Sequence, residues 1–142
     1  MFQFEKLTPE SLPAMRELLE VYAVAFEDPV SYRSQPPSDL YLQKILARDT
    51  FITIVAKAEG RVVGGLSAYV LEKFEQERSE IYIYDLAVLE AFRRRGVARG
   101  LITTLKNKAA AHGAWVIFVQ ADYGDEPAIQ LYESMGTREE VL

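Results

Sequence analysis

The sequence contains no cysteine and only one histidine, His112. The absence of cysteine excludes disulfide bonds, thiolate metal ligands and a cysteine nucleophile. A single histidine argues against a histidine-based metal site and against a Ser-His-Asp triad. We therefore expect no metal, and we interpret His112 as a residue near the end of a helix.

Long apolar runs are also missing, as is the basic, apolar and small-residue pattern of a secretory signal at the start of the chain. Neither a membrane span nor export is indicated, so we expect a cytoplasmic protein. The 142 residues are 49% hydrophobic and 26% charged, which is typical of one globular domain. No linker or repeat divides the chain, and we predict a single domain over residues 1–142.

Acidic residues outnumber basic ones, and the formal net charge of -5 disfavours nucleic acid and anionic membranes as partners. A cationic partner is compatible with this charge. Four arginines nevertheless crowd into one short stretch, at positions 93, 94, 95 and 99. This local reversal of charge is the first sign of a binding site.

Apolar periodicity and turn residues predict an alternation of helices and strands. We predict helices over 9–26, 38–46 and 96–111 and between Asp125 and Gly136, and strands over 2–7, 51–58, 62–71, 79–89 and 115–121, with a loop over 27–37. Thr8 and Pro9 are expected to start the first helix, and Gly113 to end the third. The apolar run at 115–121 is typical of a buried strand. The order predicts an α/β fold.

The arginine cluster lies where a strand should run through a short loop into a helix. Gly96 and Ala98 would let a ligand approach the backbone, and the first N–H groups of the helix would point at it. Arginines at a helix N-terminus oppose the helix dipole, at about 0.3–1 kcal/mol each, until an anion arrives. An anion site is therefore a better interpretation than a solvated basic turn.

Arg93-x-x-Gly96-x-Ala98 matches the Q/R-x-x-G-x-G/A motif of GNAT acyltransferases, and Leu131-Tyr132-Glu133-Ser134-Met135-Gly136 resembles a second signature of that superfamily. The resemblance implies a mixed, mostly antiparallel central sheet flanked by helices, with splayed strands around an acetyl-CoA site. It implies that the coenzyme A pyrophosphate and pantetheine arm contact Leu86, Ala87, Val88, Arg93, Arg94, Arg95, Gly96, Val97, Ala98 and Arg99.

Further stretches are similar to aminoglycoside 3-N-acetyltransferases of the gentamicin-resistance type. They are the segments at 81–88, 119–125 and 138–141. This likeness implies a cationic aminoglycoside as acceptor, acetylation of its 3-amino group, antibiotic resistance and a homodimer.

Without cysteine, an acyl-enzyme thioester is excluded, and we expect direct transfer within a ternary complex. The acceptor ammonium must first lose a proton to a carboxylate. Asp85 is the first candidate base and Glu80 the reserve, while a substrate anchor or structural acceptor stays open as the role of Asp85. The resemblance implies that the Tyr132 phenol protonates or hydrogen-bonds the departing thiolate, although a helical tyrosine is more often core packing.

Acidic residues suit a polycationic acceptor. Candidate substrate-binding residues are Asp28, Tyr84, Asp122, Asp125 and Glu126, with Glu27, Glu139 and Glu140 as further contributors, although Asp125 is also placed to cap a helix.

Two other functions stay open. Acidic loops suit a polyamine or a protein amine equally well. The Arg93–Ala98 motif alone is also compatible with a non-catalytic coenzyme A binding module, an alternative that the presence of both Asp85 and Tyr132 disfavours.

Overall fold

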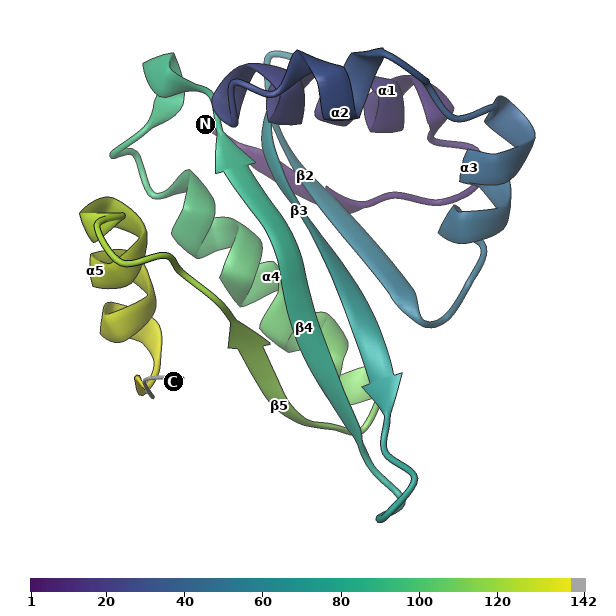
Figure 1. Cartoon of the computed structure of the whole chain (residues 1–142), viewed down its shortest axis with the longest axis vertical. Helices are drawn as coiled ribbons and strands as arrows, with labels where there is room; N and C mark the ends of the chain where they lie inside the picture. Colours follow the sequence, from purple (N-terminus) through teal and green to yellow (C-terminus); the bar gives the residue numbers. More distant parts are fainter. Residues whose placement is uncertain (139–142) are drawn as a thin grey trace.

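The computed structural model describes residues 1–138, which form five strands, five α-helices and one 3-10 turn (Figure 1). The elements are β1 (Gln3–Lys6), α1 (Leu12–Ala25), α2 (Pro29–Arg33), α3 (Asp39–Leu46), β2 (Phe51–Ala58), β3 (Arg61–Glu72), β4 (Ser79–Val88), the 3-10 turn η1 (Glu90–Phe92), α4 (Val97–Ala111), β5 (Ala114–Val119) and α5 (Glu126–Met135). Among these helices, none is long and apolar enough to cross a bilayer.

The five strands form one sheet in the order β1-β2-β3-β4-β5. Neighbouring strands are antiparallel except β4 and β5, which are parallel. A parallel pair needs a crossover connection, and α4 supplies it. The prediction of a mixed, mostly antiparallel sheet with helices beside it is confirmed.

Helices cover the two faces of the sheet unequally (Figure 1). Ile52 and Ile54 belong to the apolar cluster that includes Leu101 of α4. Val55, one residue out of phase on β2, belongs to the cluster built around Leu18 of α1. Each such buried side chain contributes about 1.5–3 kcal/mol. We refer to the two surfaces below as the α4 face and the α1 face.

The first helix begins later than predicted, at Leu12 rather than at residue 9. Thr8 and Ser11 form a turn instead, because the Thr8 N–H donates to Ser11 Oγ at 3.0 Å and the Ser11 N–H donates to the Thr8 carbonyl at 2.9 Å. Ser11 is the N-cap residue, and Pro13 rather than Pro9 occupies the first turn.

The segment over 27–37 is not entirely a loop, because it contains the short helix α2. Asp28 caps this helix by accepting the Ser31 N–H at 3.1 Å, and Pro29 occupies its first turn. A proline there helps to start a helix, since its fixed φ suits the position and its missing N–H would have had no helical partner. Three prolines and little apolar periodicity had favoured a loop here, but one of these prolines starts a helix.

The β2–β3 hairpin and the start of α3 are as predicted. Glu59 and Gly60 both have positive φ, of 52° and 78°, as a two-residue hairpin turn requires. Ser38 caps α3 by accepting the Tyr41 N–H at 3.1 Å.

The prediction that residues 115–121 form a buried strand is wrong. Within residues 1–138, β5 lies at the edge of the sheet, and it ends at Val119. The Trp115 side chain is 67% exposed and stacks under the Arg78 guanidinium at 4.4 Å. An apolar run alone did not distinguish an edge strand from a central one.

Candidate active site

Strand β4 changes character halfway along. Its residues from Ser79 to Ile83 pair with both β3 and β5. From Asp85 to Val88 the described residues pair only with β3, since the β5 ladder stops at Val119. The strands therefore separate beyond Ile83, and one edge of β4 is left open.

A β-bulge lies at the point of separation. Ile83 is paired with Ala68 and Asp85 with Ser67, so Tyr84 is an extra residue in β4. Simple alternation would have aimed Asp85 at the α4 face, where Ile83 is buried. The extra residue shifts the alternation and places Asp85 opposite Ser67 on the α1 face.

Backbone groups of the second half of β4 point into the opening. The Leu89 N–H donates to the Val63 carbonyl at 2.8 Å, which identifies a hydrogen-bonded pair. By the alternation of an antiparallel ladder, Ala87 bonds to β3 whereas the N–H groups of Leu86 and Val88 face away from it. The Val88 carbonyl also faces outward, where it accepts Arg93 Nε at 2.9 Å.

The start of α4 also exposes backbone donors. Gly96 is the N-cap residue with φ of 81°, and the first helical bond runs from the Gly100 N–H to its carbonyl at 2.9 Å. The N–H groups of Val97, Ala98 and Arg99 thus precede the helical ladder. A Cβ built at Gly96 meets no described atom within 4 Å, so space for a ligand lies beside these donors.

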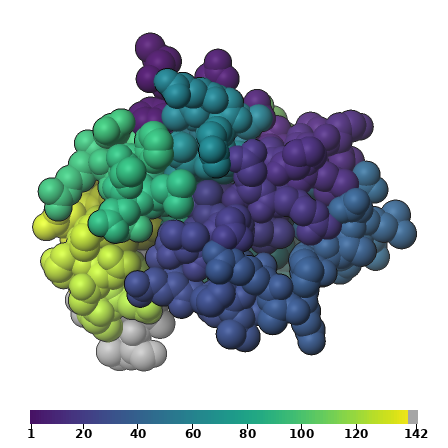
Figure 2. Space-filling model, turned by 90° about the horizontal axis from the view of Figure 1, so that it is seen from above, coloured from purple at the N-terminus to yellow at the C-terminus, as the bar shows by residue number. Residues whose placement is uncertain are grey.

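The arginines of this loop are held in different ways. Arg95 lies over the Phe92 ring at 5.7 Å, and Arg99 donates to Ser134 Oγ of α5 at 2.7 Å. Arg94 adopts a positive φ of 63°, which is uncommon for a residue with a side chain. Figure 2 shows α5 and the start of α4 beside each other on one flank of the molecule.

A cleft of about 240 Å³ lies where β4 and β5 separate. It brings together Tyr84, Asp85 and Leu86 of β4, Asp122 and Asp125 of the following loop, Tyr132 of α5 and Phe26 at the end of α1. Five of these lining residues are catalytic or substrate-binding candidates from the sequence analysis: Asp85, Tyr132, Tyr84, Asp122 and Asp125. In the described chain the cleft lining includes no lysine or arginine.

Asp85 is partly buried in this cleft. Burial raises the pKa of its carboxyl above the ordinary value, and a hydrogen bond from Tyr32 opposes the rise. The Tyr32 hydroxyl donates to Asp85 Oδ2 at 3.2 Å. A carboxylate with a raised pKa is a better proton acceptor than an ordinary one.

Tyr132 is half-buried on α5. Burial and then the nearby Asp125 carboxylate raise the pKa of its phenol. The phenol therefore stays protonated at neutral pH and is able to donate a hydrogen bond. Asp125 has a second task, because it caps α5 by accepting the Ala128 N–H at 3.4 Å.

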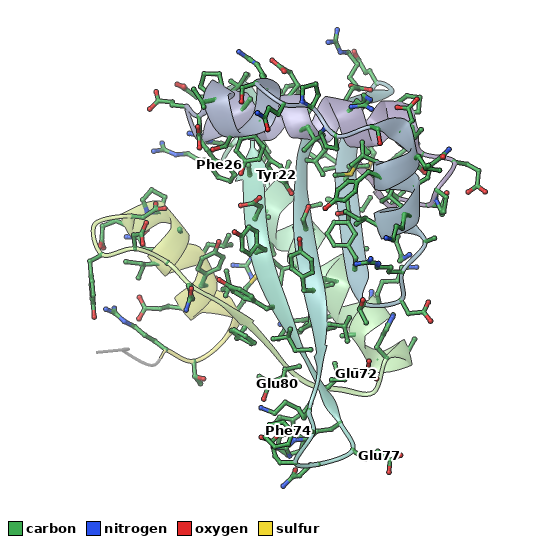
Figure 3. All side chains as sticks on the ribbon, turned by 45° about the vertical axis from the view of Figure 1, so that its right-hand side comes forward. Tyr22, Phe26, Glu72, Phe74, Glu77 and Glu80 are labelled. Carbon is green, nitrogen blue, oxygen red and sulfur yellow. The ribbon has the colours of Figure 1, made fainter. Side chains whose placement is uncertain are left out.

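The structure does not bring the other nominated carboxylates into the cleft. Glu80 lies toward the β3–β4 hairpin, at the opposite end of the sheet from Tyr22 and Phe26, and pairs with Lys73 at 3.6 Å (Figure 3). Asp28 caps α2, and the Ser31 hydrogen bonds lower its pKa. Glu27 and Glu126 are exposed and outside the cleft lining, while Glu139 and Glu140 lie outside the described residues.

Sequence reasoning missed Tyr32 because the segment around it was read as a loop. Its partner Asp85 is 53 positions away in the chain, a separation at which no local pattern signals a contact. The proline at position 29 after Asp28 was the available sign of a helix start.

A second hollow of about 550 Å³ lies beside the β2–β3 turn and η1. Phe2, Phe92 and Arg95 are among its lining residues, and Asp85 and Tyr132 are not. It is the larger of the two, but the chemically competent groups converge in the cleft at β4.

Comparison with known proteins identifies relatives. The profile described as the acetyltransferase (GNAT) family matches residues 13–137. The crystal structure of an aminoglycoside acetyltransferase from an uncultured soil metagenomic sample is 51% identical, with a TM-score of 0.97 over 100% of this chain and 95% of that one. A second such enzyme from an uncultured soil metagenomic sample, solved in complex with sisomicin, is 34% identical, with a TM-score of 0.91 over 99% of this chain and 92% of that one.

A more distant curated relative is an N-alpha-acetyltransferase of Sulfurisphaera tokodaii, 27% identical over 96 residues. The match spans 55% of that protein's length and 60% of this chain.

Proposed function

The chain belongs to the acetyltransferase (GNAT) family and has its fold, and from this premise we propose that it acetylates an amine of an aminoglycoside antibiotic, the 3-amino group, using acetyl-CoA. The proposal includes a cytoplasmic location, action as a single-domain protein, resistance to gentamicin-type antibiotics and assembly as a homodimer. The observation that carries it is the whole-chain similarity to an aminoglycoside acetyltransferase at 51% identity.

The residues present fit acetyl-CoA. The free N–H groups at the start of α4 and the Arg93–Arg99 cluster suit the pyrophosphate, since a helix N-terminus with nearby arginines favours anions. The outward-facing backbone of Leu86 and Val88 offers an open strand edge to the amides of the pantetheine arm. Bound there, acetyl-CoA supplies an activated acetyl thioester.

The side chains of the cleft have distinct roles in this proposal. Asp85 accepts a proton from the acceptor ammonium, because only the neutral amine has a lone pair. The outward N–H of Leu86 is placed to stabilise negative charge on a carbonyl oxygen. Tyr132 carries a proton at its phenol oxygen for the leaving group.

The acceptor is recognised mainly by charge. Asp122 and Asp125 line the same cleft as Asp85, and ammonium groups match a cleft whose described lining lacks basic residues. Tyr84, 61% exposed, lies beside them. Glu80, Asp28 and Glu126 are not part of the proposed site because the structure gives them other positions.

Release of coenzyme A from acetyl-CoA tests the proposal, with gentamicin, spermidine and a lysine-containing peptide as separate acceptors. We expect rapid release with gentamicin and a product acetylated at the 3-amino group by NMR. Faster release with spermidine or with the peptide would show that the acceptor is a polyamine or a protein amine rather than an aminoglycoside. Coenzyme A binding without release for any acceptor would favour a non-catalytic binding module.

A further inference from the structure

A row of aromatic side chains crosses the α1 face of the sheet next to Asp85. Its members come from four strands: Phe51 of β2, Tyr69 of β3, Tyr82 and Tyr84 of β4 and Phe118 of β5. Neighbouring ring centroids are 4.8 to 6.0 Å apart. Tyr69 and Tyr84 remain 42% and 61% exposed, so part of this row faces solvent rather than a core.

Three of the rings form a right-angled arrangement that we name the aromatic corner, consisting of Tyr69, Tyr82 and Tyr84. The Tyr84 ring stands at 85° to that of Tyr69, with centroids 5.8 Å apart. It stands at 81° to that of Tyr82, at 6.0 Å. Rings at right angles present π faces in more than one direction, and a cation over an exposed π face is attracted by the ring quadrupole.

The bulge in β4 fixes the position of the corner relative to the reactive carboxylate. Because Tyr84 is the extra residue, Tyr84 and Asp85 are consecutive and both serve the α1 face. Burial raises the pKa of Tyr69, and the nearby Tyr84, Tyr41 and Asp85 raise it further; among these neighbours the Asp85 carboxylate makes the corner an electronegative neighbourhood.

An electronegative neighbourhood argues for a cationic occupant. An apolar partner would have to cover the phenol oxygens and the Asp85 carboxylate, which costs free energy if they are left without hydrogen bonds. A ligand ammonium gains instead from the π faces and from the carboxylates of the adjoining cleft. Charge complementarity thus favours an amine over a hydrophobic surface.

We propose that the aromatic corner binds a second ammonium group of the acceptor, distinct from the amine that Asp85 deprotonates. This inference rests on the proposed function, and it deepens it by requiring acceptors with at least two cationic amines. Binding of the second amine at the corner holds the acceptor in the cleft with its first amine near Asp85, and an acceptor with a single amine cannot make both contacts.

Tyr84→Leu and Tyr69→Leu test the corner, since both side chains are exposed and leucine retains apolar volume without a π face. The readouts are the Kd of sisomicin by calorimetry and the separate kcat and KM values. We expect the Kd and KM to rise about 3- to 30-fold, with kcat within about twofold. Tyr84→Phe keeps the ring and should stay within about threefold of the wild type.

Phe74→Leu is the matched control, because Phe74 is a 99% exposed aromatic residue at the β3–β4 hairpin (Figure 3). It should leave sisomicin binding unchanged. An unchanged Kd in Tyr84→Leu and Tyr69→Leu would overturn the proposal, as would a wild type that binds neither sisomicin nor tetramethylammonium. If the wild type acetylates no acceptor but the two leucine variants still bind sisomicin more weakly, the corner remains a binding site and the proposed function is wrong.

Sedimentation of the same variants tests the competing occupant, a second copy of the chain. If the wild type sediments as a dimer and Tyr84→Leu sediments as a monomer, the aromatic corner is part of a subunit interface and the inference is overturned. An unchanged mass with weaker sisomicin binding supports it. Circular dichroism of each variant confirms that the fold is retained.

Discussion

The two halves of β4 belong to one strand but differ in how their edges are paired. From Ser79 to Ile83 the strand is paired on both edges, and Ile81 and Ile83 are buried against the α4 face. From Tyr84 to Val88 one edge is open in the described structure, and the candidate base follows immediately after the bulge. One extra residue and the separation of β5 thus open the second half of the strand to a ligand.

Helix starts show a similar contrast. Ser38 and Asp125 cap α3 and α5 with side-chain oxygens. Gly96 starts α4 and has no side chain to offer, although four arginines lie within or beside this start. A side-chain cap accepts one backbone N–H at the start of α3 and of α5, whereas α4 has no such cap, an arrangement that suits the proposed anion.

The largest expected effect comes from replacing the carboxylate in the open half of β4. Asp85→Asn removes the proton acceptor while it keeps shape, and we expect kcat/KM to fall about 10²- to 10⁴-fold. Asp49→Asn is the control, since Asp49 is exposed in the loop before β2. Steady-state rates of coenzyme A release give the comparison, and a loss below about threefold would remove Asp85 as the base.

The same variant should not be less stable than the wild type at pH 7. Burial raises the pKa of Asp85 in the folded state, so the folded state favours the protonated carboxyl. The contribution of Asp85 to the free energy of unfolding is therefore complete below the unfolded pKa and is lost as pH rises through the folded pKa. Asparagine stays neutral throughout. The Tm difference should favour Asp85→Asn at pH 7 and shrink at pH 3, and the reverse order would contradict the assigned pKa direction.

Gly96→Ala tests the uncapped helix start. Alanine at φ of 81° should cost about 1–2 kcal/mol of stability, and its methyl group would enter the space beside the backbone donors. Gly113→Ala is the matched control, because Gly113 lies just after the end of the same helix, has φ of 61° and also has open space where a Cβ would lie. Both variants should lose similar stability in thermal melts, whereas KM for acetyl-CoA should rise only in Gly96→Ala, by about 10-fold for the loss of one charge-assisted contact.

A smaller effect is expected from Tyr32→Phe, which removes the hydroxyl that donates to Asp85. This hydrogen bond lowers the pKa of the carboxyl, so its loss should move the acid limb of the kcat/KM profile to higher pH. Tyr22 of α1 and Tyr69 of β3 also interact with Asp85, and Tyr84 lines the same cleft; all three tyrosines are kept in this variant.

Tyr123→Phe, on an exposed loop residue, is the control for the pH profile. At high pH the Tyr32→Phe and wild-type profiles should converge, because Asp85 is ionised in both. A parallel loss of activity at every pH would indicate a structural role for Tyr32 instead.

These comparisons also separate what the sequence predicted from what it did not. The hairpin at Gly60, the cap at Ser38 and the helix start at Gly96 are set by neighbouring residues, and the structure confirms them. The bulge at Tyr84 depends on the partner strand, and the Tyr32–Asp85 contact joins segments far apart in the chain. Local patterns carry no signal for either.

The smallest effect should come from the other half of β4. Glu80 was the reserve base in the sequence analysis, yet it pairs with Leu71 and Val116 in the ladders on its two sides and forms an ion pair with Lys73. Five positions separate it from Asp85, about 16 Å along a strand. Glu80→Gln should therefore change kcat/KM by less than about twofold, since a partly exposed ion pair contributes little. A large loss in coenzyme A release would show instead that both halves of the strand take part in the chemistry.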